Sequence, residues 1–391
     1  MKKIKVFLLA AGFTLCLIGQ VFAAETALPE EYTAPPGDLL PAVTARSAVV
    51  MEATTGKILY SRNMDERRYP ASTTKIMTLI VALEEGSLDD MVAASENASH
   101  TEGSTIWLEP GEKMRMLDLL YGMMLVSGND ATVAVAEHIA GSVDAFAQRM
   151  TAKAHEIGAV NTSFVNSSGL PDERHYTTAH DLALIAAYGY GNPMFEQIVS
   201  TKERQIPWGK NDYDRVLRNE NQMLWLYDGG NGVKTGYTDA AGRCLVSAAK
   251  RDGIQLVAVV LDSQYMWNDS IALLNYGFEK IHPVKLAAKN STIKTVDVIS
   301  GRKKSLELKL AEDLTVPEAD QDQGKFFKVI HSPDQVYAAV RQGDVLGTMD
   351  IMYDGKKIAS ANLVAAESIE KKSFFLAVYQ GVARCVQFIL A

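Results

Sequence analysis

The sequence predicts a mixed α/β (α+β) domain over residues 41–282, a small all-β domain over residues 283–368 and an amphipathic helix over residues 369–391. Three observations indicate this order. Apolar residues at helical spacing alternate with short apolar strands as far as Pro283. Beyond that proline, alternating strands and a hairpin signal replace the helices. At the end of the chain, apolar residues gather on one face of a helical projection.

Residues 1–24 have the three parts of a secretory signal peptide. Lys2, Lys3 and Lys5 come first, an apolar run over residues 6–19 follows, and the small residues at 23–24 end it. An uncleaved anchor is the alternative, but about 14 apolar residues are fewer than the roughly 20 that a spanning helix needs. We therefore expect secretion, with residues 25–40 as a flexible lead-in.

The first domain opens with a predicted hairpin, because the apolar run 48–51 is followed by residues 55–60, in which the turn residue Gly56 precedes a second apolar run. Apolar residues at helical spacing make residues 72–85 a helix, with Ser72 at its start. Residues 127–130 form a turn between two of the later helices. The remaining predicted segments are helices at 117–124, 131–139, 178–188 and 271–278, and strands at 245–248 and 256–261.

The all-β domain is predicted from alternation and from one hairpin. Residues 295–298 and 305–310 alternate apolar and polar side chains, as half-buried strands do. Asp354-Gly355 lies between two further apolar runs and is a strong signal for a tight hairpin turn.

The C-terminal segment, wound as a helix, separates polar from apolar side chains. Gln380, Arg384 and Gln387 align on one face, and phenylalanines and valines gather on the other. A transmembrane span is disfavoured, since three polar side chains would lie at membrane depth. A helix that docks on the protein body is a second alternative. We expect an interfacial anchor that holds the protein peripherally on the outer face of the cytoplasmic membrane.

The charge of the chain excludes one class of partner. The formal net charge is −8, and loss of the three leader lysines would make the mature chain still more acidic. A chain with this excess of acidic residues has no general attraction to nucleic acid.

Three short motifs carry the candidate chemistry: Ser72-Thr73-Thr74-Lys75, Ser127-Gly128-Asn129 and Lys234-Thr235-Gly236. A serine hydroxyl is a poor nucleophile until a base takes its proton. Lys75 lies one helical turn after Ser72 and on the same face, so it can be that base. Its ammonium form must then be disfavoured by burial and by another cation, which Lys234 could supply.

Each motif alone is weak. Ser-x-x-Lys also begins at residues 247, 291, 300 and 368, and Ser-x-Asn also begins at residues 61, 95 and 360. The setting discriminates between them, because only Ser72 opens an apolar helix and only Ser127 begins a turn between two buried helices. Lys-Thr-Gly occurs once.

In this order and at these wide separations, the three motifs are the signature of penicillin-recognising serine acyl transferases. The chain resembles the D-alanyl-D-alanine carboxypeptidases, the low-molecular-mass penicillin-binding proteins, from about residue 41 to 280 and more weakly beyond. Segments 166–170, 178–183 and 219–221 share the resemblance. It implies a β-lactamase-like fold, removal of the terminal D-alanine from peptidoglycan pentapeptide stems, and covalent inhibition by β-lactam antibiotics.

The resemblance also implies the roles of the catalytic residues. Ser72 attacks the carbonyl between the last two D-alanines, and Lys75 takes its proton. Ser127 relays a proton to the leaving amine, while Asn129 orients Lys75 and the substrate amide. The backbone N–H groups of Ser72 and Tyr237 form the oxyanion hole.

Substrate binding is assigned in the same way. Lys234 and Thr235 bind the terminal carboxylate, Gly236 lets the substrate lie close against the strand, and Tyr237 contributes its backbone N–H. The family often carries a basic residue near the segment 265–269, where this chain reads Tyr-Met-Trp-Asn-Asp. The second partner of the carboxylate is therefore left unassigned.

Two other functions and a metal site compete with this interpretation. An efficient β-lactamase needs a carboxylate to activate water, usually within Glu-x-x-x-Asn, and no glutamate from 137 to 220 has an asparagine four residues on. A wall-binding scaffold of the same fold would not need an intact set of motifs. His175, His180 and Asp181 could suggest zinc, but His-Glu-x-x-His is absent from the sequence. We expect no metal and no cofactor.

Overall fold

The computed structural model describes residues 40–209, 211–319, 322, 324–372 and 382. The predicted signal peptide at 1–24, the lead-in except residue 40, and the predicted helix beyond residue 372 (382 aside) lie outside the described residues. Residues 369–372 are extended: Ile369 bridges to Val340, and Lys371 bridges to Gly301. Any C-terminal helix therefore begins after Lys372.

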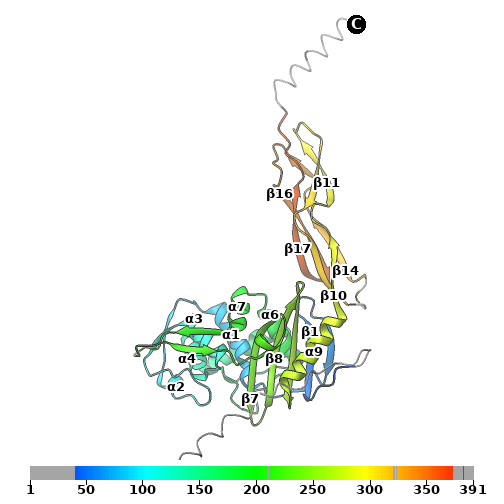
Figure 1. Ribbon diagram of the computed structural model, residues 1–391. Helices are drawn as coiled ribbons and strands as arrows, with labels where there is room; N and C mark the ends of the chain where they lie inside the picture. The colour runs from blue at the N-terminus through cyan, green and yellow to red at the C-terminus, as the bar shows by residue number, and fades with distance from the viewer. Residues whose placement is uncertain (1–39, 210, 320–321, 323, 373–381, 383–391) are drawn as a thin grey trace, which may run out of the picture. The chain divides into compact units, whose positions relative to one another are not determined.

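The prediction of a mixed α/β part followed by an all-β part is confirmed (Figure 1). The helices are η1 (Ala71–Thr74, 3-10), α1 (Lys75–Glu85), α2 (Glu96–Ser99), α3 (Met116–Leu125), α4 (Asn129–Ala140), α5 (Val143–Glu156), α6 (Ala179–Gly189), α7 (Pro193–Ser200), α8 (Met223–Leu226) and α9 (Met266–Lys280). The strands of the first part are β1 (Ser47–Glu52), β2 (Ile58–Arg62), β3 (Met91–Ala93), β4 (Lys113–Arg115), β5 (Glu203–Ile206), β6 (Arg215–Arg218), β7 (Gly230–Thr238), β8 (Gly242–Arg251) and β9 (Ile254–Ser263).

A five-stranded antiparallel sheet in the order β2-β1-β9-β8-β7 organises the first part. Alternate residues of its strands enter two different cores, as strand geometry requires. Val257 and Val259 pack with the helical cluster around α1, whereas Leu256 and Val260 pack with Leu273 of α9. Strand β7 lies at the edge of the sheet, so one side of its backbone has no neighbouring strand in that sheet.

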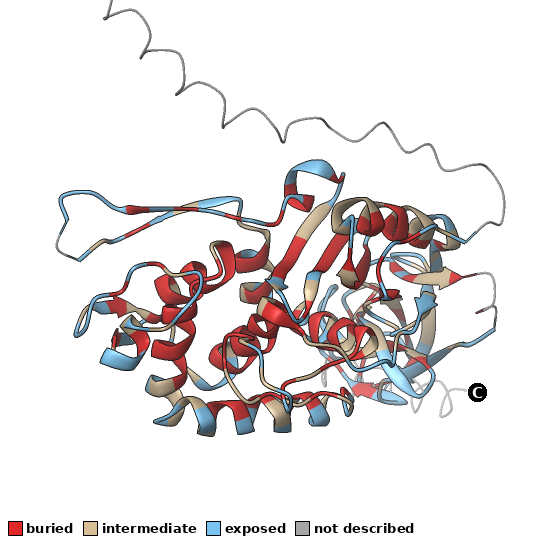
Figure 2. Ribbon diagram, turned by 90° about the horizontal axis from the view of Figure 1, so that it is seen from below, coloured by how far each residue is buried: buried red, intermediate tan, exposed pale blue. Residues whose placement is uncertain are grey.

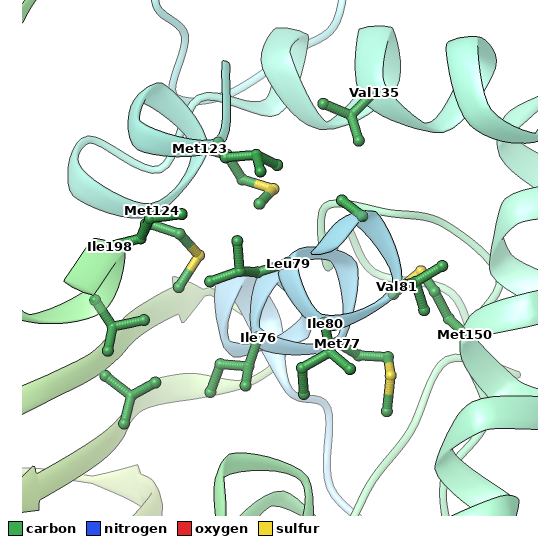
Figure 3. Packing of buried hydrophobic residues seen from close by; sticks show 14 of the residues in the cluster. Ile76, Met77, Leu79, Ile80, Val81, Met123, Met124, Val135, Met150 and Ile198 are labelled. Carbon is green, nitrogen blue, oxygen red and sulfur yellow. The ribbon is translucent and has the colours of Figure 1, made fainter. Parts of the chain in front are cut away.

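Helix α1 runs through the middle of the larger core. Its residues from Lys75 to Ala82 are all buried, and its apolar side chains point outward in every direction toward α3, α4, α5 and α7 (Figure 3). Figure 2 shows where residues are buried in the whole chain: they are concentrated along the helices and the central strands. A helix packed on all sides is held rigidly, and it positions the serine and lysine at its N-terminal end.

The all-β part has its own core of strand residues. Its strands are β10 (Ile281–Ala287), β11 (Thr292–Ile299), β12 (Ser305–Leu310), β13 (Leu314–Ala319), β14 (Phe326–His331), β15 (Gln335–Tyr337), β16 (Val345–Tyr353) and β17 (Lys356–Ala365). β14-β16-β17-β12-β11-β15 form one sheet, and β10 pairs with β13. The predicted hairpin at Asp354-Gly355 joins β16 and β17 and is confirmed.

Several elements differ from the predicted ones. The predicted helix at 72–85 begins as a 3-10 turn, and α9 begins at Met266 rather than at residue 271. Helix α5 was not predicted, because only four of its residues are buried and its apolar stripe is narrow. Strands β8 and β9 are longer than predicted: small, polar or charged residues extend β8 at both ends, and Ile254, Gln255, Asp262 and Ser263 extend β9.

Candidate active site

The tight turn η1 presents Ser72 to solvent and to Lys75. Ala71 takes up a left-handed conformation at φ +49°, and Thr73 Oγ1 donates to Pro70 O at 2.7 Å, which closes the turn. Ser72 is half-buried, and its Oγ lies 2.9 Å from Lys75 Nζ. The predicted pairing of the two side chains across one turn is therefore present in the structure.

Lys75 is fully buried, and its amine is surrounded by oxygen atoms. Besides Ser72 Oγ, Nζ lies 2.7 Å from Asn129 Oδ1 and 2.9 Å from Ser168 O. Burial lowers the pKa of Lys75 well below its usual value, and the positive charge of Lys234 lowers it further. Glu220 and Asp130 act in the opposite direction but are the smaller causes. The environment thus favours the neutral amine, which can accept a proton.

The second motif lies in the turn between α3 and α4. Ser127 has a left-handed backbone at φ +64°, and its side chain lines the cleft in front of Ser72. Asn129 is the first residue of α4, and its Nδ2 donates to Glu102 O at 2.7 Å, so Oδ1 is directed at Lys75. The buried Asp130 carboxylate accepts from the N–H of Ile106 at 3.0 Å, which fixes the loop beside this turn.

The third motif lies on the edge strand β7. Lys234 is buried, with Nζ 3.2 Å from Thr235 O, 3.3 Å from Thr235 Oγ1 and 3.7 Å from Glu220 Oε2. Burial lowers the pKa of Lys234, and the Glu220 carboxylate partly opposes that effect. Thr235 Oγ1 also donates to Glu220 Oε2 at 3.3 Å. A lysine, a threonine and a glutamate therefore form one polar group at this end of the cleft.

Gly236 lies directly against the serine turn. A Cβ atom there would meet Ser72 N at 2.9 Å, and Ala71 Cβ and Pro70 O at 3.1 Å. Only glycine allows β7 to approach the turn this closely. From the sequence, we expect a glycine at position 236 because a substrate lies close to the strand. In the structure, a side chain at this position would instead collide with the serine turn.

A cleft of about 530 Å³ joins the three motifs. Five of the predicted site residues line it, namely Ser72, Ser127, Thr235, Gly236 and Tyr237. The other three, Lys75, Asn129 and Lys234, are buried and make the contacts described above. All eight predicted residues thus belong to one site. Its wall also contains Ser104, Glu220, Arg243, Met266 and Trp267.

Besides the wall residues just named, the backbone carbonyl of Ser168 contributes to the site and was not predicted. Ser168 offers only its backbone carbonyl to Lys75, and the loop that holds it is shaped by Asn166, whose Oδ1 accepts from Gly169 N at 2.7 Å. Ser168 and Glu220 lie in segments 166–170 and 219–221, which share the family resemblance but have no role assigned from the sequence. A backbone carbonyl has no sequence signature, and the proximity of Glu220 to Lys234 depends on long-range folding.

The histidines considered for a metal site have other partners. The buried His175 accepts from Val165 N at its Nδ1, 3.2 Å away, and its Nε2 lies 2.9 Å from Thr74 Oγ1. His180 Nδ1 lies 3.2 Å from Asp65 Oδ1. Within the described part of the chain, no group of three or more histidine, cysteine or acidic residues could hold a metal ion.

Comparisons with known proteins match both parts of the chain. Residues 32–265 match the family model described as D-alanyl-D-alanine carboxypeptidase, and residues 282–371 match the C-terminal domain of penicillin-binding protein 5. The D-alanyl-D-alanine carboxypeptidase DacF of Bacillus subtilis is 36% identical over 84% of this chain and 87% of its own length. The carboxypeptidase DacC of Escherichia coli is 33% identical over 86% of each chain. The crystal structure of penicillin-binding protein 5 from Haemophilus influenzae is similar, with a TM-score of 0.61, 32% identity and coverage of 86% of this chain and 100% of that one.

Proposed function

The chain belongs to the D-alanyl-D-alanine carboxypeptidase family of serine hydrolases, and from this premise we propose that Ser72 and Lys75 carry out its reaction. The enzyme removes the terminal D-alanine from peptidoglycan stem peptides and binds penicillin. The observation that carries the proposed roles is the 2.9 Å contact between Ser72 Oγ and the amine of a buried lysine.

In the proposed acylation step, Ser72 Oγ attacks the carbonyl carbon of the penultimate D-alanine and its proton passes to Lys75 Nζ. The lowered pKa of Lys75 supports this role, because a neutral amine is required to accept the proton. Ser127 passes its proton to the nitrogen of the departing D-alanine as the peptide bond breaks, and Lys75 gives the proton it accepted to Ser127, which leaves the lysine amine neutral again. Water then attacks the ester, which releases the shortened peptide and restores Ser72 Oγ–H.

Negative charge on the carbonyl oxygen would be stabilised by two backbone donors. We assign this oxyanion hole to the N–H groups of Ser72 and Tyr237. The close approach of Gly236 to Ser72 N supports the assignment, since it brings the strand that carries Tyr237 against the serine turn. Removal of one such donor typically costs about 10²- to 10³-fold in rate.

The carboxylate of the terminal D-alanine would bind at the other end of the cleft. Lys234 is buried there, the nearby Glu220 carboxylate favours its charged form, and Thr235 Oγ1 lies 3.3 Å from its amine. Hydrogen bonds from these groups are stronger to an ionised carboxylate than to a neutral amide or ester oxygen, so they favour a substrate with a free C-terminus. This requirement would make the enzyme a carboxypeptidase rather than an endopeptidase.

The two alternatives are disfavoured. The assembled serine–lysine pair and the family match favour turnover over a scaffold without activity. For a β-lactamase, the glutamate that lines the cleft would have to activate water, but Glu220 is close to Lys234 and accepts from Thr235. We therefore expect penicillin to acylate the enzyme and to leave slowly.

The site of action follows from the substrate, because peptidoglycan lies outside the cytoplasmic membrane. We propose that residues 1–24 direct secretion and that the C-terminal segment after Lys372 holds the enzyme peripherally at the outer face of the membrane. Its alternation of polar and apolar faces supports this proposal. In the part of the chain that the structure describes, no helix is long and apolar enough to span a bilayer.

The test is release of D-alanine from diacetyl-Lys-D-Ala-D-Ala by the purified protein without residues 1–24. The wild type should release one D-alanine per peptide. Lys75→Ala should fold normally and lose about 10²- to 10⁴-fold in rate, the range expected for loss of a general base. Wild-type activity in Lys75→Ala would assign the base to another group.

A further inference from the structure

Arg243 at the rim of the cleft has no role in the reaction as described so far. We infer that its guanidinium is the second cation that binds the terminal carboxylate of the substrate, opposite Lys234. This inference rests on the proposed function and deepens it. The second positive charge at the carboxylate would then come from β8. Helix α9 contributes only the uncharged Met266 and Trp267 to the wall of the cleft.

The sheet register places Arg243 beside the residues that bind substrate. It lies directly opposite Tyr237, and Leu245, two residues further along β8, lies opposite Thr235. Directly opposite Cβ atoms are about 5 Å apart, and diagonal neighbours on the same face are about 7–8 Å apart. Since side chains alternate along a strand, Arg243, Tyr237 and Thr235 share one face of the sheet. The long arginine side chain can therefore reach a carboxylate bound at Thr235.

The guanidinium of Arg243 is available for a ligand. Arg243 is exposed, and among the described residues no carboxylate lies within 4.0 Å of its guanidinium. Other arginines of the first part are paired with carboxylates: Arg215 lies 2.9 Å from Glu112, and Arg204 lies 3.1 Å from Asp118.

The charges around the cleft also require a second cation. The Glu220 carboxylate is 3.7 Å from Lys234 Nζ, so the pair carries little net charge toward an incoming anion. Asp239 is a further negative group, which accepts from Tyr237 Oη at 2.9 Å. Asp262, near the start of β8, is already paired with Arg46 at 3.1 Å. Arg243 is the arginine in the cleft wall that can restore a positive potential at the carboxylate end.

Arginine suits this position chemically. Its planar guanidinium presents two N–H groups that match both oxygens of a carboxylate. The ammonium of Lys234 provides a point charge. The two N–H groups of the Arg243 guanidinium, which approach the carboxylate from the other side, would fix the orientation of the terminal D-alanine. The pair would select substrates that end in a free carboxylate.

The experiment compares Arg243→Gln, Arg243→Lys and Lys250→Gln with the wild type. Lys250 is the matched control, because it is an exposed cation at the other end of the same strand and its loss changes the net charge equally. Each variant is assayed for kcat/KM on diacetyl-Lys-D-Ala-D-Ala and on the same peptide with a C-terminal amide. The rates of acylation by benzylpenicillin and by its methyl ester provide a second comparison between a ligand with a free carboxylate and its neutral analogue.

Arg243→Gln should lower kcat/KM for the acid by about 10- to 100-fold, the range for loss of a charged hydrogen bond. The loss for the amide should stay below about twofold, Arg243→Lys should recover part of the loss, and Lys250→Gln should match the wild type. Equal losses on acid and amide, or an equal effect of Lys250→Gln, would overturn the inference. If the wild type released no D-alanine, the proposed function would fail, and the penicillin acid-to-ester ratio would still decide the role of Arg243.

Discussion

Replacement of Gly236 by alanine tests how closely the edge strand must approach the serine turn. The added Cβ would lie 2.9 Å from Ser72 N, whereas ordinary contact begins near 3.4 Å, so strand and turn must separate by about 0.5 Å. The atoms it meets are backbone atoms or the Cβ of Ala71, so no side-chain rotation can relieve the contact. Overpacking of this kind costs about 1–3 kcal/mol of stability.

The same displacement should slow catalysis. A shift of 1 Å in a positioned group costs about 10²-fold in rate, so half that shift predicts a loss of about tenfold in kcat/KM. D-alanine release and penicillin acylation measure this loss, and thermal unfolding measures the stability. Gly209→Ala is the control, because its Cβ would meet only the Glu112 side chain, at 3.2 Å or more. Wild-type rates and stability in Gly236→Ala would refute the argument.

Three further predictions concern the pKa of Lys75, the pKa of His175 and the C-terminal segment. The charge of Lys234 helps to lower the pKa of Lys75, so Lys234→Gln should raise that pKa. In the pH–rate profile for acylation by a penicillin ester, the acid limb should then move to higher pH, and an unmoved limb would contradict the coupling between the two lysines. Burial lowers the pKa of His175 from 6.5 to about 4, so the neutral ring stabilises the fold above pH 6.5 and about 3 kcal/mol is lost as the pH falls to 4. Urea unfolding should show this loss in the wild type and not in His175→Gln. Deletion of residues 373–391 should move the enzyme from the membrane pellet to the supernatant with little change in turnover, and a truncated enzyme that still pelleted would rule out the anchor.

Local sequence patterns were sufficient for much of the fold. The hairpin at β1–β2, helix α1 and the hairpin at β16–β17 each have short-range signals, namely turn glycines and apolar periodicity, and all three are confirmed. Helix α5 lacks such a signal, because its exposed face outweighs its narrow buried stripe. The order β2-β1-β9-β8-β7 could not be derived either, since it brings together strands about 200 residues apart in the chain.

The site shows the same division. Three motifs identified the residues that meet in the cleft, and the need for a second cation beside Lys75 was inferred from the chemistry of a lysine base. The carbonyl of Ser168 could not be predicted, because every residue has one. Arg243 could not be predicted either, since its position opposite Tyr237 depends on the register of two strands.

The identity of the nucleophile is the central claim, and mass spectrometry of the protein after reaction with benzylpenicillin tests it most directly. If Ser72 is the nucleophile, the intact wild-type protein gains the mass of one penicillin, and digestion places the adduct on the peptide that contains Ser72. Ser72→Ala should gain no mass under the same conditions. An adduct on another residue, or an unchanged adduct on Ser72→Ala, would contradict the account.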